Sequence, residues 1–115
     1  QAFRANGAGD TLQGGGYEAL AGQRFDVVIN ATSASLSAAL PPLPASAFET
    51  DGLAYDMVYG KGLTPFLRLA QGAGVRQLAD GVGMLAEQAA EAFAWWRGVR
   101  PDTQAVIEQL RVPLV

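Results

Sequence analysis

The hydrophobic residues of the chain fall into short runs, several of them with the composition of β-strands. The run Phe25–Asn30 is rich in β-branched residues and ends in a polar residue, which is typical of a strand buried on both faces of a parallel sheet. Leu53–Tyr59 reads as a second strand with aromatic residues near its end, and Val75–Ala79 as a short third strand. The pattern therefore predicts three strands in this part of the chain.

A helix is predicted after the second strand. Thr64 is placed as its N-cap and Pro65 as its first residue, a combination that favours a helix start. The helix should end at Gly72 or Gly74, because glycine is the usual residue at a helix C-terminus.

Two further helices are expected near the end of the chain. The first covers Val82–Arg97 and is closed by Gly98, and the second begins at Pro101–Asp102 and ends at about Leu110. In the first of them, helical spacing predicts one buried stripe. Its members are Val82, Leu85, Ala86, Ala89, Phe93 and Trp96.

Strands that alternate with helices indicate an α/β fold with a parallel sheet. Ligands of such sheets bind outside the carboxyl ends of the strands. This rule selects three loops that should converge on one site: Asn30–Ser33, Met57–Tyr59 and Asp80–Gly81.

Composition narrows the chemistry. The 115 residues contain no Cys and no His. Disulfides, Cys/His zinc sites, thiol catalysis and Ser-His-Asp triads are therefore excluded within this chain, and no metal site is expected. The net charge is −3 and the eight basic residues are scattered, which argues against a nucleic acid partner. No apolar stretch approaches the length of a membrane span, and with no targeting segment the cytoplasm is the expected compartment.

The stretch Asp80–Gln88 carries glycines into a helix and an amide two turns later. Gly81 and Gln88 are seven residues apart, which places them on one helix face about 10 Å apart, a separation that suits two adjoining small molecules. The stretch from Gly81 to Ala86 also matches the pattern G-x-G-x-x-A. Two explanations are open for these glycines: close packing of the helix on the sheet, or binding of a pyrophosphate. Met57 and Tyr59 lie two residues apart, so in an extended segment both point to one side. Either Met57 packs in the core and Tyr59 lies on the surface, or both contact a ligand. Gln88 is either solvated or a ligand contact.

Five motifs in this order resemble the C-terminal part of bacterial shikimate dehydrogenases, over roughly residues 17–111. They are Asn30–Ser33, Tyr55–Tyr59, Thr64–Leu67, Asp80–Leu85, and Gln88–Ala89 with Phe93–Trp95. Ser35 departs from the glycine expected after the first motif, which affects the cofactor geometry of that loop.

The resemblance implies the C-terminal half of a Rossmann-like, doubly wound parallel sheet in a three-layer αβα arrangement. Residues 1–115 would be a partial NADP-binding domain with C-terminal helices, and the N-terminal substrate domain would be absent from the chain. The implied reaction is the NADP-dependent interconversion of 3-dehydroshikimate and shikimate. The implied cofactor contacts are Thr32, Ser33, Met57 and Gly81, and the implied substrate contacts are Tyr59 and Gln88.

The resemblance also implies that the catalytic Lys and Asp pair of the family lies N-terminal to this chain. Hydride reduction of a ketone needs a proton donor, so the 115 residues by themselves are expected to be inactive. A truncated sheet exposes an unpaired edge and apolar surface, so self-association, as in a homodimer, is expected. Three alternatives stay open: a quinate or shikimate dehydrogenase that uses NAD, a non-catalytic α/β interaction module, and another Rossmann-type oxidoreductase.

Overall fold

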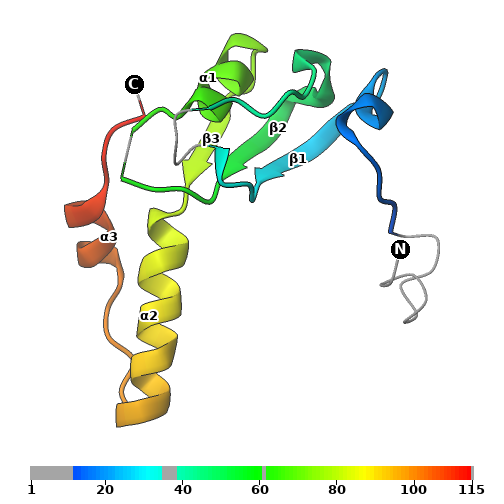
Figure 1. Cartoon of the computed structure of the whole chain (residues 1–115). Helices are drawn as coiled ribbons and strands as arrows, with labels where there is room; N and C mark the ends of the chain where they lie inside the picture. Colours follow the sequence, from blue (N-terminus) through cyan, green and yellow to red (C-terminus); the bar gives the residue numbers. More distant parts are fainter. Residues whose placement is uncertain (1–11, 35–38, 61, 115) are drawn as a thin grey trace.

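The computed structural model describes residues 12–34, 39–60 and 62–114 (Figure 1). The position Ser35 lies outside the described residues. Two short 3-10 turns, Tyr17–Leu20 and Ala45–Ala47, precede β1 and β2.

Three parallel strands form one sheet in the order β1-β2-β3. Their bounds are Phe25–Asn30 for β1, Phe48–Asp56 for β2 and Gln77–Asp80 for β3. The three arrows in Figure 1 end at one edge of the sheet, from which α2 leads away. The predicted parallel α/β architecture is confirmed, as are the bounds of β1.

The predicted bounds of the other two strands were shifted. The second strand was expected at Leu53–Tyr59, but β2 begins at Phe48 and ends at Asp56. Met57–Tyr59 therefore lie beyond the strand, and the expectation that they belong to one sheet face was wrong. The strand pairing explains where β2 ends, because Asp56 pairs with Asn30, the last residue of β1, and with Asp80, the last residue of β3.

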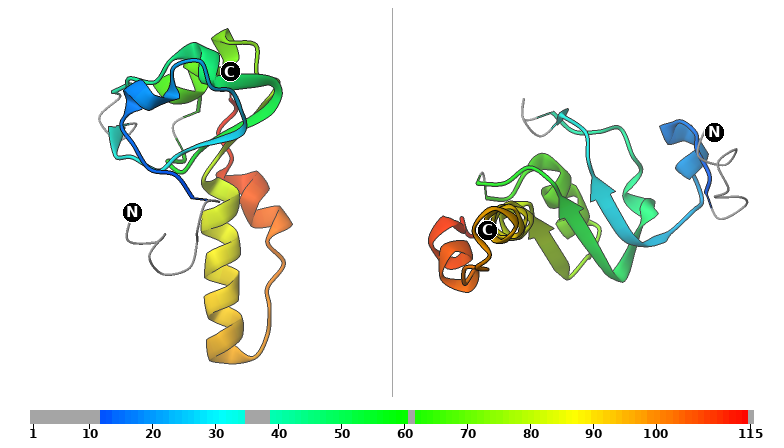
Figure 2. Two further views of the ribbon diagram at one scale, coloured as in Figure 1. Left: turned by 90° about the vertical axis from the view of Figure 1, so that its right-hand side faces the viewer. Right: turned by 90° about the horizontal axis from the view of Figure 1, so that it is seen from below.

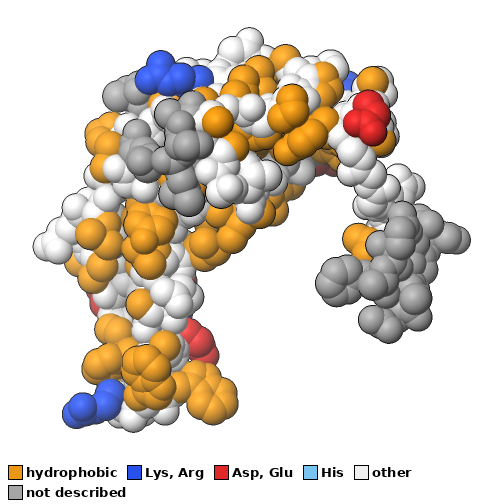
Figure 3. Space-filling view, in the orientation of Figure 1, with side chains coloured by type: hydrophobic (Ala, Val, Ile, Leu, Met, Phe, Trp, Pro, Cys, Tyr) orange, Lys and Arg blue, Asp and Glu red, His pale blue; other side chains and the backbone are white. Residues whose placement is uncertain are grey.

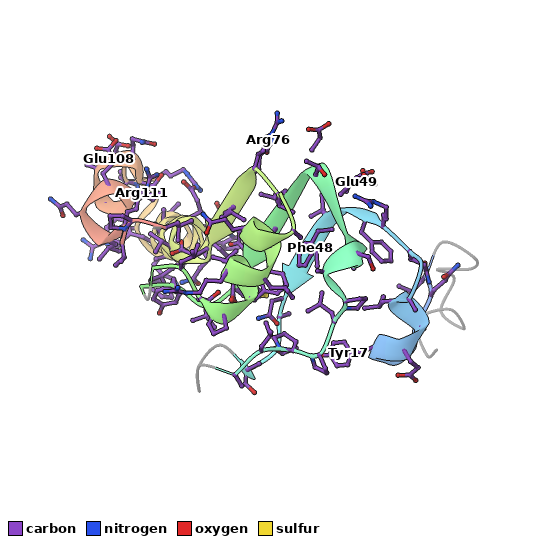
Figure 4. The ribbon with its side chains drawn as sticks, turned by 90° about the horizontal axis from the view of Figure 1, so that it is seen from above. Tyr17, Phe48, Glu49, Arg76, Glu108 and Arg111 are labelled. Atoms are coloured by element: carbon purple, nitrogen blue, oxygen red, sulfur yellow. The ribbon has the colours of Figure 1, made fainter. Side chains whose placement is uncertain are left out.

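One face of the sheet carries the core. Helix α1, Pro65–Gly72, begins and ends as predicted, with the Thr64 side chain accepting a hydrogen bond from the Leu67 backbone N–H. Phe66 and Leu67 of this helix are buried, and the Phe66 ring lies 5.7 Å from that of Phe48, centroid to centroid. Figure 4 shows Phe48 beside β2, whereas Arg76 points away from the molecule.

The opposite face of the sheet is bare along β1. Val27 and Ile29 are 54% and 59% exposed, so the expectation of a strand buried on both faces does not hold for the described residues. Val28, one residue between them, packs against the core on the other face. Within the described part of the chain, α1 covers one face of the sheet, and a third layer over β1 is not present.

Helices α2, Val82–Arg97, and α3, Gln104–Leu110, pack against each other and extend away from the sheet (Figures 1 and 2). Gly98 adopts the left-handed conformation that closes α2, as predicted. Helix α3 begins later than expected, because Asp102 forms a turn with the Gln104 N–H before the helix starts.

The predicted buried stripe of α2 was only partly right. Val82 and Ala86 are buried, but Phe93 is 43% exposed and Trp96 is 78% exposed. Hydrophobic side chains gather at the far end of this helix in Figure 3, where Trp95 is also exposed. No helix among the described residues has the length and apolar character of a membrane span.

Candidate functional site

Three polar residues lie side by side at the carboxyl edge of the sheet. Asn30 pairs with Asp56, and Asp56 pairs with Asp80, so the last residues of three adjacent strands share one level. In each, the side-chain Oδ1 accepts a hydrogen bond from the backbone N–H two residues later, at 3.1 to 3.2 Å. Such turns are formed readily by Asn and Asp, and each turns the chain out of its strand.

The first turn shapes the loop that carries Thr32 and Ser33. Asn30 Oδ1 accepts from the Thr32 N–H and, at 2.7 Å, from the Thr32 hydroxyl. The Thr32 hydroxyl oxygen in turn accepts from the Ala34 N–H at 3.3 Å. Thr32 and Ser33 are both exposed, but the Thr32 proton is already used within the loop, so Ser33 has the freer hydroxyl.

The second turn begins the loop that carries Met57 and Tyr59. The Met57 N–H donates to the Asn30 carbonyl oxygen at 3.1 Å, which ties this loop to the first one. Met57 is 38% exposed and Tyr59 is 46% exposed. Both side chains are thus available to a ligand at the sheet edge.

The third turn brings Gly81 against the backbone of Met57. A Cβ added to Gly81 would collide with the Met57 carbonyl oxygen and lie 2.9 Å from its carbonyl carbon, so only glycine permits this approach. The Gly81 N–H donates to the Val58 carbonyl at 3.3 Å. The predicted convergence of the three loops is therefore confirmed, and two of the predicted cofactor contacts, Met57 and Gly81, touch.

Asp80 also sets the electrostatics beside this edge. Its Oδ1 is used in the turn, whereas its Oδ2 is buried and has no hydrogen-bond partner among the described residues. Burial, and then the negative charge of Asp80, raise the pKa of the Tyr55 phenol above its ordinary value. The Tyr55 phenol therefore loses its proton less readily than an ordinary tyrosine.

Gln88 lies two turns into α2 and is exposed. Its amide Nε2 donates to the Leu85 carbonyl oxygen at 3.2 Å, within the same helix. The structure shows no contact between Gln88 and Tyr59, so the described residues do not assemble the two predicted substrate contacts into one cluster.

A separate hollow of about 620 Å³ lies between β3, the start of α2, and α3. Its lining includes Tyr55, Asp80, Met84 and Arg111. None of the six predicted contact residues lines this hollow, so it is not the site that the sequence indicated.

Sequence reasoning named Thr64 as a helix cap but did not assign a role to Asp56. The structure buries Asp56 completely and joins its Oδ2 to the Thr64 hydroxyl at 2.6 Å. The available signal was an Asp at the end of a strand, eight residues before a helix cap, and sequence separation alone does not reveal that contact.

The chain is similar in sequence to proteins of known function. Residues 81–111 match the model of the shikimate 5'-dehydrogenase C-terminal domain. A shikimate dehydrogenase (NADP(+)) of Nitrosospira multiformis is 63% identical over 98 residues, which are 85% of this chain and 36% of that protein. The chain is homologous to the C-terminal part of shikimate dehydrogenases.

Solved structures give the same assignment of the fold. An Ael1 enzyme from Pseudomonas putida superposes on 99% of this chain and 42% of its own, with a TM-score of 0.88 and 63% identity. Shikimate 5-dehydrogenase from Thermus thermophilus, in complex with NADP(H) and shikimate, superposes on 74% of this chain and 33% of its own, with a TM-score of 0.64 and 39% identity. The Rossmann-like α/β fold and the family resemblance are confirmed, and the chain spans little more than a third of the curated relative.

Proposed function

We propose that this chain is the cofactor-facing C-terminal part of an NADP-dependent shikimate dehydrogenase, which interconverts 3-dehydroshikimate and shikimate. The observation that carries the proposal is the contact between Gly81 and Met57 at the carboxyl edge of a parallel sheet, where ligands of such sheets bind. The identity of 63% to a shikimate dehydrogenase over 98 residues supports the substrate assignment.

The residues at this edge fit a nicotinamide cofactor. NADP, when bound, supplies the hydride acceptor or donor. Met57 offers a half-exposed apolar side chain to a flat ring, and the Gly81 carbonyl, which accepts from the Leu85 N–H, keeps a second lone pair for a carboxamide donor. Thr32 and Ser33 border the same edge, with the Ser33 hydroxyl as the freer of the two.

Tyr59 and Gln88 are assigned to the substrate. Both side chains are exposed, and each carries a group that can hydrogen-bond a hydroxyl or carboxylate. The proposal assigns proton transfer to the alkoxide to residues outside this chain, where the resemblance places the catalytic Lys and Asp pair of the family. The 115 residues by themselves are accordingly expected to turn over no substrate.

The deciding experiment is shikimate-dependent reduction of NADP by the full-length gene product, with quinate and NAD as paired controls. Turnover with shikimate and NADP would support the proposal. Turnover only with quinate or with NAD would transfer the assignment to the sister activity. A protein without activity on any pair would favour the non-catalytic α/β module.

A second experiment tests whether catalysis requires residues outside this chain. The chain is joined behind the N-terminal part of the Nitrosospira multiformis enzyme, in place of the segment to which it is 63% identical. We expect the chimera to reduce NADP with shikimate and the separate 115-residue chain to be inactive. An active separate chain would contradict the assignment of proton transfer to residues outside it.

A homodimer and a cytoplasmic location complete the proposal. The exposed Val27 and Ile29 of β1 present an apolar surface that either another part of the protein or a second copy could cover. Light scattering on the full-length gene product would show a mass of two chains if the homodimer forms and of one chain if it does not. Cell fractionation tests the location.

A further inference from the structure

We infer that Asp56 and Thr64 act together as positioning residues, which hold Met57 and Tyr59 in place at the cofactor and substrate site. This inference rests on the proposed function and extends it to two residues that lie behind the contacting side chains. Neither residue needs to touch a ligand, since both are almost fully buried, Asp56 at 0% and Thr64 at 3% exposed.

The two carboxylate oxygens of Asp56 hold two different parts of the chain. Oδ1 accepts from the Val58 N–H at 3.1 Å, which fixes the backbone between Met57 and Tyr59. Oδ2 accepts from the Thr64 hydroxyl at 2.6 Å. A carboxyl side chain is rarely buried unless its oxygens are satisfied, so these bonds explain why Asp56 is tolerated at this place.

Thr64 connects Asp56 to helix α1, which packs in the core. Its hydroxyl oxygen also accepts from the Leu67 N–H at 3.2 Å, as the N-cap of α1. Leu67 and its neighbour Phe66 are buried in the core. The segment after β2 is thus anchored at its start to the sheet and, through one hydroxyl, to a helix packed on that sheet.

The bonds of Asp56 to Val58 and Thr64 lie at the point where the three loops meet. The Val58 carbonyl, next to the N–H that Asp56 holds, accepts from the Gly81 N–H. Met57 lies one residue past Asp56 and its backbone touches Gly81. Release of the Asp56 bonds should therefore move Met57 relative to Gly81, and small misplacements of this kind cost reaction rate heavily.

The difference from the neighbouring turns supports a special role for Asp56. Asn30 and Asp80 form the same turn with the N–H two residues later. Asp56 lies between them in the sheet and adds the bond to a helix cap. The middle loop is therefore coupled to the core through Thr64.

The test compares Thr64→Val with Thr64→Ser in the full-length gene product. Valine has nearly the same shape but removes the donor to Asp56 and the acceptor for Leu67, whereas serine keeps both. We expect Thr64→Val to lower kcat/KM by about 10- to 100-fold, with a raised KM for NADP, and Thr64→Ser to stay within about threefold of the natural protein.

Asp56→Asn tests the other partner, because its Nδ2 cannot accept the Thr64 proton. If the two residues act as one unit, the double variant Asp56→Asn with Thr64→Val should lose no more activity than the worse single variant. Asp102→Asn is the matched control, since Asp102 forms the same turn with Gln104 but lies exposed and away from the sheet edge. It should leave both kinetic constants unchanged.

The KM separates positioning from mere loss of folded protein. A smaller folded fraction lowers kcat and leaves KM unchanged, so a fall in kcat alone, with serine no better than valine, would overturn the inference. If Asp56→Asn does not fold, the Thr64 pair still decides. A natural protein without activity on shikimate would instead overturn the proposed function, which is a separate outcome.

Discussion

The carboxyl edge of the sheet and the α2–α3 pair are held together in different ways. At the sheet edge the bond between Asp56 and Thr64 is buried, and Asn30 is 4% exposed. Between α2 and the segment that leads into α3 the polar contacts lie on the surface, where Arg100 pairs with Glu87 and Glu91.

The two kinds of contact differ in how firmly they hold the parts of the chain that they join. A buried hydrogen bond is expensive to break, because the freed groups find no water. A surface ion pair contributes little, because water and salt replace it. The structure therefore fixes the three loops of the candidate site more firmly than the direction of α2, on which Gln88 lies.

The largest expected effect compares the core that supports the sheet with the α2–α3 pair, by truncating one aromatic side chain in each. Phe66→Ala in the core should lower the free energy of unfolding by about 3–5 kcal/mol, because it leaves a cavity against Phe48. Trp96→Ala, at a side chain that is 78% exposed, should change it by less than about 0.5 kcal/mol. Chemical denaturation of the full-length gene product measures both.

If Trp96→Ala lowered the free energy of unfolding as much as Phe66→Ala, the proposed difference between the two regions would be wrong. It would mean that α2 is buried against another part of the protein, and that the helix is as firmly held as the sheet.

The second prediction sharpens the role of the sheet edge. Gly81→Ala should destabilise the protein by about 1–3 kcal/mol and abolish most activity, because its Cβ would displace the Met57 backbone. Gly83→Ala, two residues later, meets no atom within 4 Å and should be neutral or stabilising by up to about 1 kcal/mol. Thermal unfolding with an activity assay measures the pair, and an active, stable Gly81→Ala protein would refute the close approach.

The third prediction concerns α2 and function alone. Gln88→Ala should lower kcat/KM for shikimate by about tenfold through a lost hydrogen bond, while the melting temperature stays the same. Gln104→Ala, at an exposed glutamine on α3 that bonds Glu108, is the control and should change neither. Unchanged kinetics for Gln88→Ala would remove this residue from the substrate site.

The smallest expected effect is the pH dependence of the α2–α3 contact. Hydrogen bonds from Thr103 and then Arg100 lower the pKa of Glu87. A carboxylate with a lowered pKa in the folded state stabilises the contact above its unfolded pKa, and this contribution is lost as the pH falls through the folded pKa. Amide exchange in α3 should therefore speed up in acid relative to Glu87→Gln, in which the contact no longer titrates.

In Glu87→Gln the intrinsic pH dependence of exchange is the same, so only the difference between the two proteins reports on Glu87. Identical ratios at every pH would show that the surface contact does not hold α3. High salt should weaken the natural contact in the same direction as acid.

Local signals in the sequence predicted several elements with accurate bounds. Helix α1 was found from Thr64 and Pro65, and α2 from its periodicity and Gly98, because a helix start or end depends on residues within one turn. Strand β1 was found from its β-branched run.

The bounds of β2 could not be predicted in this way. Its first half contains the polar residues Glu49–Asp51 and Gly52, which interrupt the apolar pattern, and its pairing with β1 is irregular there. Gly52 is needed because a Cβ would collide with the Asp26 carbonyl of the neighbouring strand. The strand ends at Asp56 because its neighbours end, and that is a property of the sheet.

Spacing and capping act over a few neighbouring residues, so the amino-acid pattern was enough to predict the parallel α/β class, the ends of α1 and α2, and the three loops at the carboxyl edge. Only the tertiary structure decided that Met57 rests against Gly81, that Asp56 bonds Thr64, and that Trp96 stays exposed. Each of these depends on the register of strands or on packing between elements. Such contacts join residues of different elements, and no local pattern specifies them.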